Sequence, residues 1–228
     1  LFVYLIGHGS FRRKVAKLNI PGADLSADEL DGLLSGISAR RIVVVNGASA
    51  SAAFINTLSG NGRIICTSTK SVDERYATQF MEYFIQALEE ESADQNRDDR
   101  ISVLEACQQA ASLTEAWYMG AGLLSTEHGL LDDNGDGLGS RLLEGPEKER
   151  RRRSAEDGKL AANCFLKDFQ FPPGASPEMI EAYRTILQEV ERLVQKKTEV
   201  APDVYDRDLE ALLVKAARLH RRLRMVKQ

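Results

Sequence analysis

Cysteine is scarce in this sequence, and long apolar runs are absent. The three cysteines, Cys66, Cys107 and Cys164, cannot all pair with one another and do not have the spacing of metal ligands. We therefore predict neither a disulfide framework nor a cysteine-bound metal. No apolar run is long enough for a transmembrane helix, so we expect no membrane span. The net charge of −4 shows no basic excess, which argues against nucleic acid as a partner.

The residues that are present follow the pattern of an α/β protein. Residues 1–6 (LFVYLI) and 42–45 (IVVV) are continuous apolar runs, typical of strands in a parallel sheet that is covered on both faces. Between them, Ser26 and Glu29 form a predicted capping box at the start of a helix. The sequence therefore predicts a right-handed strand–helix–strand unit.

Small polar residues follow both apolar runs. Residues 7–10 (GHGS) come after the first run, and residues 46–51 (NGASAS) come after the second. Neighbouring parallel strands lie about 4.8 Å apart, so His8 and Ser49 are expected at one edge, where open α/β sheets bind ligands. A histidine beside a hydroxyl is a minimal base–nucleophile pair. The alternative is that His8 only ends a strand and Ser49 only permits close helix packing.

These two stretches resemble the caspase and legumain family of cysteine peptidases (clan CD). That family has a His-Gly pair after one strand and its nucleophile after the next, in the motif acidic residue, Ala, Cys, any residue, Ser, Gly. Residues 8–9 (HG) resemble the first motif, and residues 47–52 (GASASA) resemble the second. Three positions depart from the family: Gly47 stands for the acid, Ser49 for the nucleophilic cysteine and Ala52 for the final glycine.

The resemblance covers roughly residues 1–137 and implies a caspase-like parallel sheet sandwiched by helices. Two further strands are expected to precede residue 1, and without them the first strand is an exposed edge. The site implied has His8 as the base and Ser49 or Ser51 as the hydroxyl nucleophile. The backbone N–H groups of Gly9 and Ser49 would stabilise an oxyanion.

The strand predicted over residues 63–69 (RIICTST) resembles the family strand whose end lines the primary specificity pocket. The resemblance therefore implies that Thr67, Ser68 and Thr69 bind substrate.

Residues 94–105 (DQNRDDRISVLE) fit the EF-hand calcium loop position by position. Position six is Asp99 instead of glycine, which weakens the predicted affinity because the turn there needs a left-handed backbone. The alternative is an acidic junction in which Ser102 and Glu105 form only a capping box. The predicted Ca²⁺ ligands at positions one, three, five, seven, nine and twelve are Asp94, Asn96, Asp98, the Arg100 carbonyl, Ser102 through water, and Glu105.

Residues 132–137 (DDNGDG) resemble the first half of a second calcium loop. Position twelve would be Leu143, which offers no ligand, and two plain turns explain the segment nearly as well. His128, just upstream, is interpreted as a structural loop histidine.

Three further regions complete the chain. Ser71 and Glu74 predict a second capping box, which opens a long amphipathic helix. Residues 1–143 form the predicted α/β domain, and residues 144–175 a charged linker that includes Arg150 to Arg153. Residues 176–228 carry two apolar stripes at helical spacing and predict an antiparallel helical hairpin. The hairpin could bind a protein partner or a second copy of the chain.

Three functions are compatible with these observations. The first is a peptidase homologue that is inactive or weak, because a serine in a site built for a thiolate is far harder to deprotonate. The second is a serine hydrolase with a Ser49–His8 dyad, and the third is a calcium-responsive interaction module. A peptide or protein is the expected substrate or ligand. A weak calcium loop fills only at the calcium levels found outside the cytoplasm, which mildly favours an exported protein.

Overall fold

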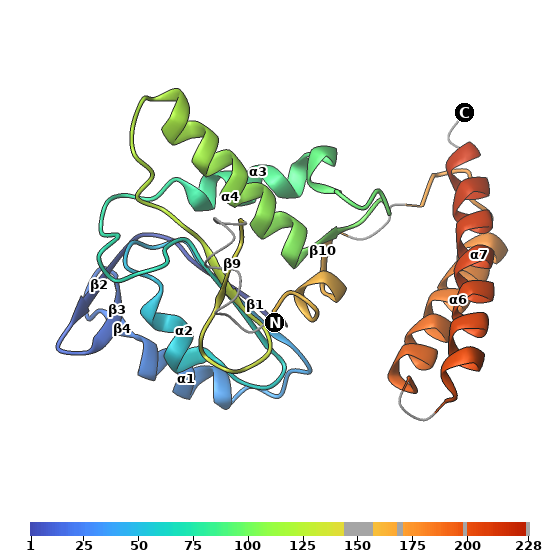
Figure 1. Ribbon diagram of the computed structural model, residues 1–228, viewed down its shortest axis with the longest axis horizontal. Helices are drawn as coiled ribbons and strands as arrows, with labels where there is room; N and C mark the ends of the chain where they lie inside the picture. The colour runs from blue at the N-terminus through green and yellow to red at the C-terminus, as the bar shows by residue number, and fades with distance from the viewer. Residues whose placement is uncertain (144–156, 168–170, 198–199, 227–228) are drawn as a thin grey trace. The chain divides into compact units, whose positions relative to one another are not determined.

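The computed structural model describes residues 1–143, 157–167, 171–197 and 200–226 (Figure 1). It divides into two units, Leu1–Asp168 and Phe169–Gln228, which we call the α/β unit and the hairpin unit. Each is described by itself.

The α/β unit is built on a five-stranded mixed sheet. The first three strands are parallel, and the last two are antiparallel additions. The predicted α/β class is confirmed, and so is the adjacency of the two apolar runs, since Phe2 lies opposite Val43 and Leu5 opposite Asn46. The strands in spatial order are β1 (Phe2–Leu5), β5 (Ile42–Asn46), β6 (Arg63–Thr67), β8 (Leu130–Asp132) and β9 (Ser140–Arg141).

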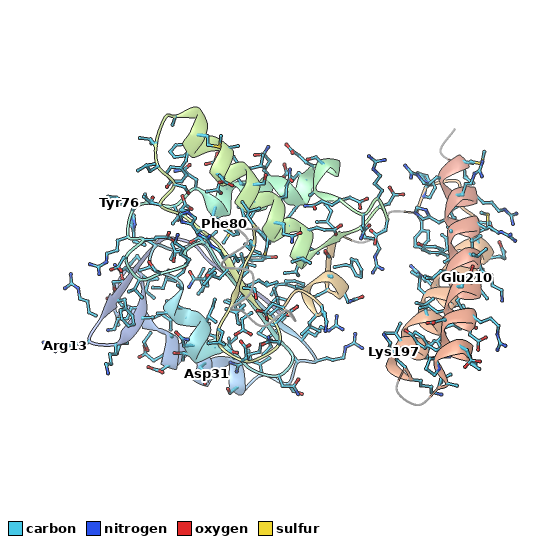
Figure 2. All side chains as sticks on the ribbon, in the orientation of Figure 1. Arg13, Asp31, Tyr76, Phe80, Lys197 and Glu210 are labelled. Atoms are coloured by element: carbon cyan, nitrogen blue, oxygen red, sulfur yellow. The ribbon has the colours of Figure 1, made fainter. Side chains whose placement is uncertain are left out.

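Helices cover both faces of the sheet (Figure 1). Val43 and Val45 of β5 pack on the side of α3 (Phe80–Glu89) and α4 (Val103–Gly120). The alternate residue Val44 packs on the side of α1 (Ala27–Ser35) and α2 (Ala53–Leu58). Phe80, labelled in Figure 2, is one of the largest side chains of this core. The predicted sandwich follows from this alternation, because every residue of β5 is buried.

The first strand is the edge of the sheet. Within the described residues β1 pairs only with β5, and its Phe2 and Tyr4 side chains are exposed. The expected exposed edge is therefore present, whereas the apolar run had predicted burial on both faces.

One small sheet was not predicted from the sequence, and one predicted helix begins later than expected. Residues 8–26 form a small antiparallel sheet of β2 (His8–Arg12), β3 (Val15–Asn19) and β4 (Leu25–Ser26). The helix predicted from Ser71 begins only at Phe80. Ser71 bonds the N–H of Asp73 in a turn, and the Glu74 carboxylate accepts the N–H of Lys70, so no capping box forms there. The capping box at Ser26 and Glu29 is confirmed.

Part of the predicted linker belongs to the α/β unit. Strand β10 (Phe165–Lys167) pairs with β7 (Ile101–Ser102), and the N–H of Val103 donates to the carbonyl of Cys164. Short 3-10 helices lie at η1 (Glu91–Ala93) and η2 (Ala161–Asn163). The predicted boundary at residue 143 is therefore too early, and Arg150 to Arg153 lie outside the described residues.

The hairpin unit consists of α6 (Pro177–Gln195) and α7 (Pro202–Met225). Ser176 accepts the N–H of Met179, and proline occupies the first turn of each helix, as the sequence indicates. Tyr183, Ala216 and Leu223 form the buried contact between the two helices. Across the described ranges, no helix is both long enough and apolar enough to cross a membrane.

Candidate functional site

The residues that follow β1 and β5 meet at the edge of the sheet formed by the carboxyl ends of these two parallel strands. Parallel pairing brings the two strand ends together, and the N–H of Gly47 donates to the carbonyl of Leu5 at 2.9 Å. Beyond β5 the chain turns sharply, with the N–H of Ala48 bonded to Asn46 Oδ1 at 3.0 Å. Ala50 has a φ of 52°, which is rare for a residue with a Cβ. We call residues 46–52 the β5 turn.

Ser49 contacts the backbone of Gly9 through both of its hydrogen-bonding functions. The N–H of Gly9 donates to Ser49 Oγ at 3.1 Å, and the Ser49 hydroxyl donates to the Gly9 carbonyl at 3.3 Å. The approach requires glycine, since a Cβ on Gly9 would lie 2.1 Å from the Ser49 carbonyl oxygen. The structure therefore brings Gly9 and Ser49 together, as their placement after neighbouring strands predicts.

The His8 imidazole does not join this contact. His8 opens β2, its backbone pairs with Asn19, and its side chain is exposed. Among the described residues no hydrogen bond links His8 to Ser49, whose hydroxyl is bonded to Gly9 instead. Ser49 itself is 2% exposed. The predicted base and nucleophile thus share an edge but form no dyad.

A later segment of the chain, residues 71–79, is hydrogen-bonded to the β5 turn. The backbone carbonyl of Glu74 accepts the N–H of Ala50 at 2.7 Å. The hydroxyl of Thr78 donates to the carbonyl of Gly47. Residues 71–79 therefore lie against the turn, and the bond from Glu74 helps to hold the unusual backbone of Ala50 in place.

The remaining hydroxyls form a closed network inside the protein. Ser51 Oγ lies 3.2 Å from Ser68 Oγ and 3.0 Å from Thr69 Oγ1. Ser68 also donates to the carbonyl of Ala48, and Thr67 donates to the carbonyl of Thr69. All four hydroxyl residues are fully buried.

The predictions for these four residues are therefore corrected. We had expected Ser51 as an alternative nucleophile, and Thr67, Ser68 and Thr69 as substrate-binding residues. Their hydroxyls satisfy one another and nearby backbone groups, so they fasten the β5 turn to the end of β6.

Sequence reasoning missed the carboxylate–histidine pair of Glu74 and His128. His128 Nδ1 lies 2.5 Å from Glu74 Oε1, and the other Glu74 oxygen accepts the N–H of Lys70 at 2.8 Å. The two residues are 54 positions apart, so spacing could not have linked them. Glu74 is almost fully buried, while the His128 side chain is 32% exposed. In this pair the His128 imidazole therefore reaches solvent while its carboxylate partner is enclosed.

Glu127 lies next to this pair and caps α3. Its carboxylate accepts the N–H of Gln79 at 2.7 Å and that of Phe80 at 3.0 Å, and the Tyr118 hydroxyl donates to it at 3.0 Å. Burial raises the pKa of the Glu127 carboxyl, against the lowering effect of the two N–H donors and with a further rise from the charge of Glu74. The buried carboxylate supplies the N-terminal cap that Ser71 was predicted to give.

The predicted calcium loop has its own hydrogen-bond pattern. Asp94 Oδ2 accepts the N–H of Asp99 at 2.7 Å, Asn96 Oδ1 accepts that of Asp98 at 2.9 Å, and Asp98 Oδ1 accepts that of Arg100 at 2.9 Å. Asp99 has a φ of 62°, the left-handed backbone expected at position six. Ser102 and Glu105 form the alternative capping box, and Glu105 Oε1 also accepts the N–H of Asn96 at 3.3 Å.

The second predicted half-loop repeats this pattern. Asp132 Oδ2 accepts the N–H of Gly137 at 2.8 Å, and Asn134 and Asp136 accept the N–H groups two residues further on. Asp157, from beyond the loop, accepts the Ser140 hydroxyl at 2.6 Å. Burial raises the pKa of Asp157, and the charges of Asp132 and Asp133 raise it further.

Metal ligation is not preassembled in either loop. Among the described residues, no group of three or more His, Cys, Asp and Glu side chains is arranged to hold a metal ion. Burial raises the pKa of the Asp98 carboxyl, and the charges of Asp94 and Glu105 add to the rise. In the first loop the acidic side chains are thus close enough to repel one another, and their oxygens are bonded to the loop backbone.

Comparison with known proteins adds no family. No protein-family model, curated protein or solved structure matches this chain.

Proposed function

We propose that this chain is a caspase/legumain-like protein that binds a peptide or protein segment and does not cleave it. The observation that carries the proposal is the two-way hydrogen bond between the Ser49 hydroxyl and the Gly9 backbone. The motif resemblance supplies the kinship, and the closed contact argues against hydrolysis.

Hydrolysis by a hydroxyl needs a base within hydrogen-bond reach and a free donor for the oxyanion. Ser49 is buried and bonded to Gly9, and the His8 side chain is exposed on β2. Of the two N–H groups expected to stabilise the oxyanion, that of Gly9 is bonded to Ser49. The hydroxyl and this oxyanion donor are thus both occupied by an internal contact.

A fluorophosphonate probe tests the absence of hydrolysis, since it labels serines that a base activates. We expect no label on Ser49 in the full chain, with a known serine hydrolase as positive control. Label on Ser49 that disappears in His8→Ala would establish the alternative serine hydrolase and overturn the proposal.

Exchanging the nucleophile gives a second test. We expect Ser49→Cys to gain no peptidase activity on a mixed peptide library, because the exposed His8 ring has no hydrogen bond to residue 49 among the described residues. Peptide cleavage by this variant would show that the remaining machinery is intact.

Peptide binding is measured by selection from a phage-displayed random peptide library. We expect selected peptides that bind the full chain and protect residues 8–12 from hydrogen exchange.

A second candidate function, calcium-responsive binding, is favoured by one observation. Both acidic loops bond the same three N–H groups to the side chains at positions one, three and five. Ca²⁺ would be held by Asp94, Asn96, Asp98, the carbonyl of Arg100 and Glu105. For Glu105 to bind the ion with both of its oxygens, it would have to leave its capping bonds with Ser102.

The calcium candidate is tested by thermal unfolding with roughly 10 mM calcium, above the weakest natural loop affinities. At ten times Kd the full chain gains about 1.4 kcal/mol of stability. Asp98→Asn keeps an oxygen for the N–H of Arg100 and removes the charge, so it should abolish the gain. Asp136→Asn is the matched control in the second loop. No calcium effect on the unaltered chain would remove the metal from the proposal.

A further inference from the structure

The side of α7 that does not pack on α6 carries an ordered stripe of side chains. Residues of the stripe recur at spacings of three and four and line two open grooves of the hairpin unit. Glu210, in the N-terminal half of this stripe, is labelled in Figure 2. From the N-terminal to the C-terminal end, the stripe runs from acidic Asp206 and Glu210 through apolar Leu213, Val214 and Ala217 to basic Arg221 and Arg224.

The middle of the stripe is apolar and exposed within the hairpin unit. Leu213 is 50% exposed and Val214 41%, while Leu223, on the side that faces α6, is fully buried. The hairpin therefore already has its internal seam, and the Leu213 side of α7 is additional apolar surface. A contiguous apolar strip bordered by charge is typical of a protein interface.

The stripe is complementary to itself when one copy is reversed. Antiparallel pairing about the midpoint between residues 215 and 216 puts Glu210 opposite Arg221 and Val214 opposite Ala217 of the other copy, and places Asp206 one position from Arg224. Each acidic position thus lies opposite or beside a basic one, and the apolar centre meets itself. A parallel pairing would instead place the acidic ends together and the basic ends together.

We propose that the α7 stripe binds the α7 stripe of a second copy of this chain, antiparallel and about a two-fold axis. Such an interface is isologous, so one self-complementary patch completes it. A helix of 24 residues offers about 36 Å of contact length at 1.5 Å per residue. The charge blocks fix the direction and the register, and the apolar centre supplies the burial.

Charge reversal in the full chain tests this arrangement by sedimentation equilibrium. Glu210→Arg places two like-charged pairs in the dimer, and Arg221→Glu does the same with the opposite sign. Each change alone should raise the dimer dissociation constant about tenfold or more, because both symmetry-related pairs become repulsive. Lys215→Glu, on α7 but outside the stripe, is the matched control and should change the constant less than twofold.

Mixing the two single variants gives the decisive measurement. The arginine at position 210 of one copy then faces the glutamate at position 221 of the other, and the unaltered Glu210–Arg221 pair faces on the other side. The mixture should regain the original dissociation constant, as should the double variant Glu210→Arg/Arg221→Glu by itself. A chain that stays monomeric at high concentration overturns the proposal, as does a dimer that is insensitive to the single changes or not restored by mixing.

Discussion

The two units of this protein treat their polar side chains in opposite ways. At the sheet edge of the α/β unit, the hydroxyls of Ser49, Ser51 and Thr69 and the carboxylate of Glu127 are buried and bonded within the unit. In the hairpin unit, α7 leaves Glu210, Leu213 and Arg221 along one side. The comparison teaches that the region with a catalytic-looking motif has its hydroxyls bonded internally. The region without any motif leaves charged and apolar side chains exposed.

The largest effect is expected inside the hairpin. Leu223→Ala removes a fully buried side chain from the seam between α6 and α7, so the hairpin unit should lose about 3 kcal/mol of unfolding free energy. Leu213→Ala, on the exposed side, should cost well under 1 kcal/mol. Trp117, the single tryptophan, lies in α4 and reports on the α/β unit. The Leu223→Ala loss should therefore appear in circular dichroism and not in tryptophan fluorescence, and equal losses by both probes would break the separation of the two units.

The next effect concerns the closest backbone contact of the α/β unit. Gly9→Ala places a methyl group against the Ser49 carbonyl, and the displacement should cost roughly 2–3 kcal/mol in urea unfolding followed by Trp117 fluorescence. Gly32→Ala in α1 is the control, because no atom lies within 4 Å of the added Cβ, and it should leave stability equal or slightly higher. If the two variants had the same stability, the β5 turn would not be fastened as described.

A smaller effect is expected in the buried hydroxyl network. Ser51→Ala deprives Ser68 and Thr69 of their shared partner and should cost about 1–2 kcal/mol. Ser59→Ala is the control, since the Ser59 hydroxyl has no hydrogen-bond partner among the described residues and its loss should be neutral or stabilising. Equal losses in urea would mean that the network contributes nothing beyond packing.

The smallest effect is a change in pH dependence. Because burial raises the pKa of Glu127, the folded protein binds a proton at a pH where the unfolded chain has released it. The contribution of this group is therefore complete below the ordinary glutamate pKa and is lost as the pH rises through the raised value. Glu127→Gln should flatten this part of the stability profile. A profile parallel to that of the unaltered chain would show that Glu127 does not titrate differently on folding.

The adjacency of β1 and β5, the covered sheet and the hairpin could be predicted from sequence because they depend on local apolar patterns, whereas the antiparallel strands β8 and β9 were not predicted. The apolar runs at residues 1–6 and 42–45 identified β1 and β5 as neighbours, and Ser176 with Pro177 marked the start of α6. The expected left-handed backbone at Asp99 is also observed, since the loop spacing alone defines that position.

The failures share one physical cause, which is that distant residues decide a local outcome. Ser71 and Glu74 have the spacing of a capping box, but the Glu74 carboxylate bonds His128, 54 positions away, and α3 is capped by Glu127 instead. The hydroxyls of Ser68 and Thr69 are likewise bonded to Ser51, which lies 17 and 18 positions earlier in the chain. Spacing could place hydroxyls at the sheet edge, but it could not show which of them would be occupied by internal hydrogen bonds.

The bond between Gly9 and Ser49 joins two segments that are 40 positions apart. The small sheet of β2, β3 and β4 is thereby anchored to the main sheet through its first strand. The Gly9 amide proton can exchange with solvent only when this bond opens, so its exchange rate would measure how often the two segments separate at that point.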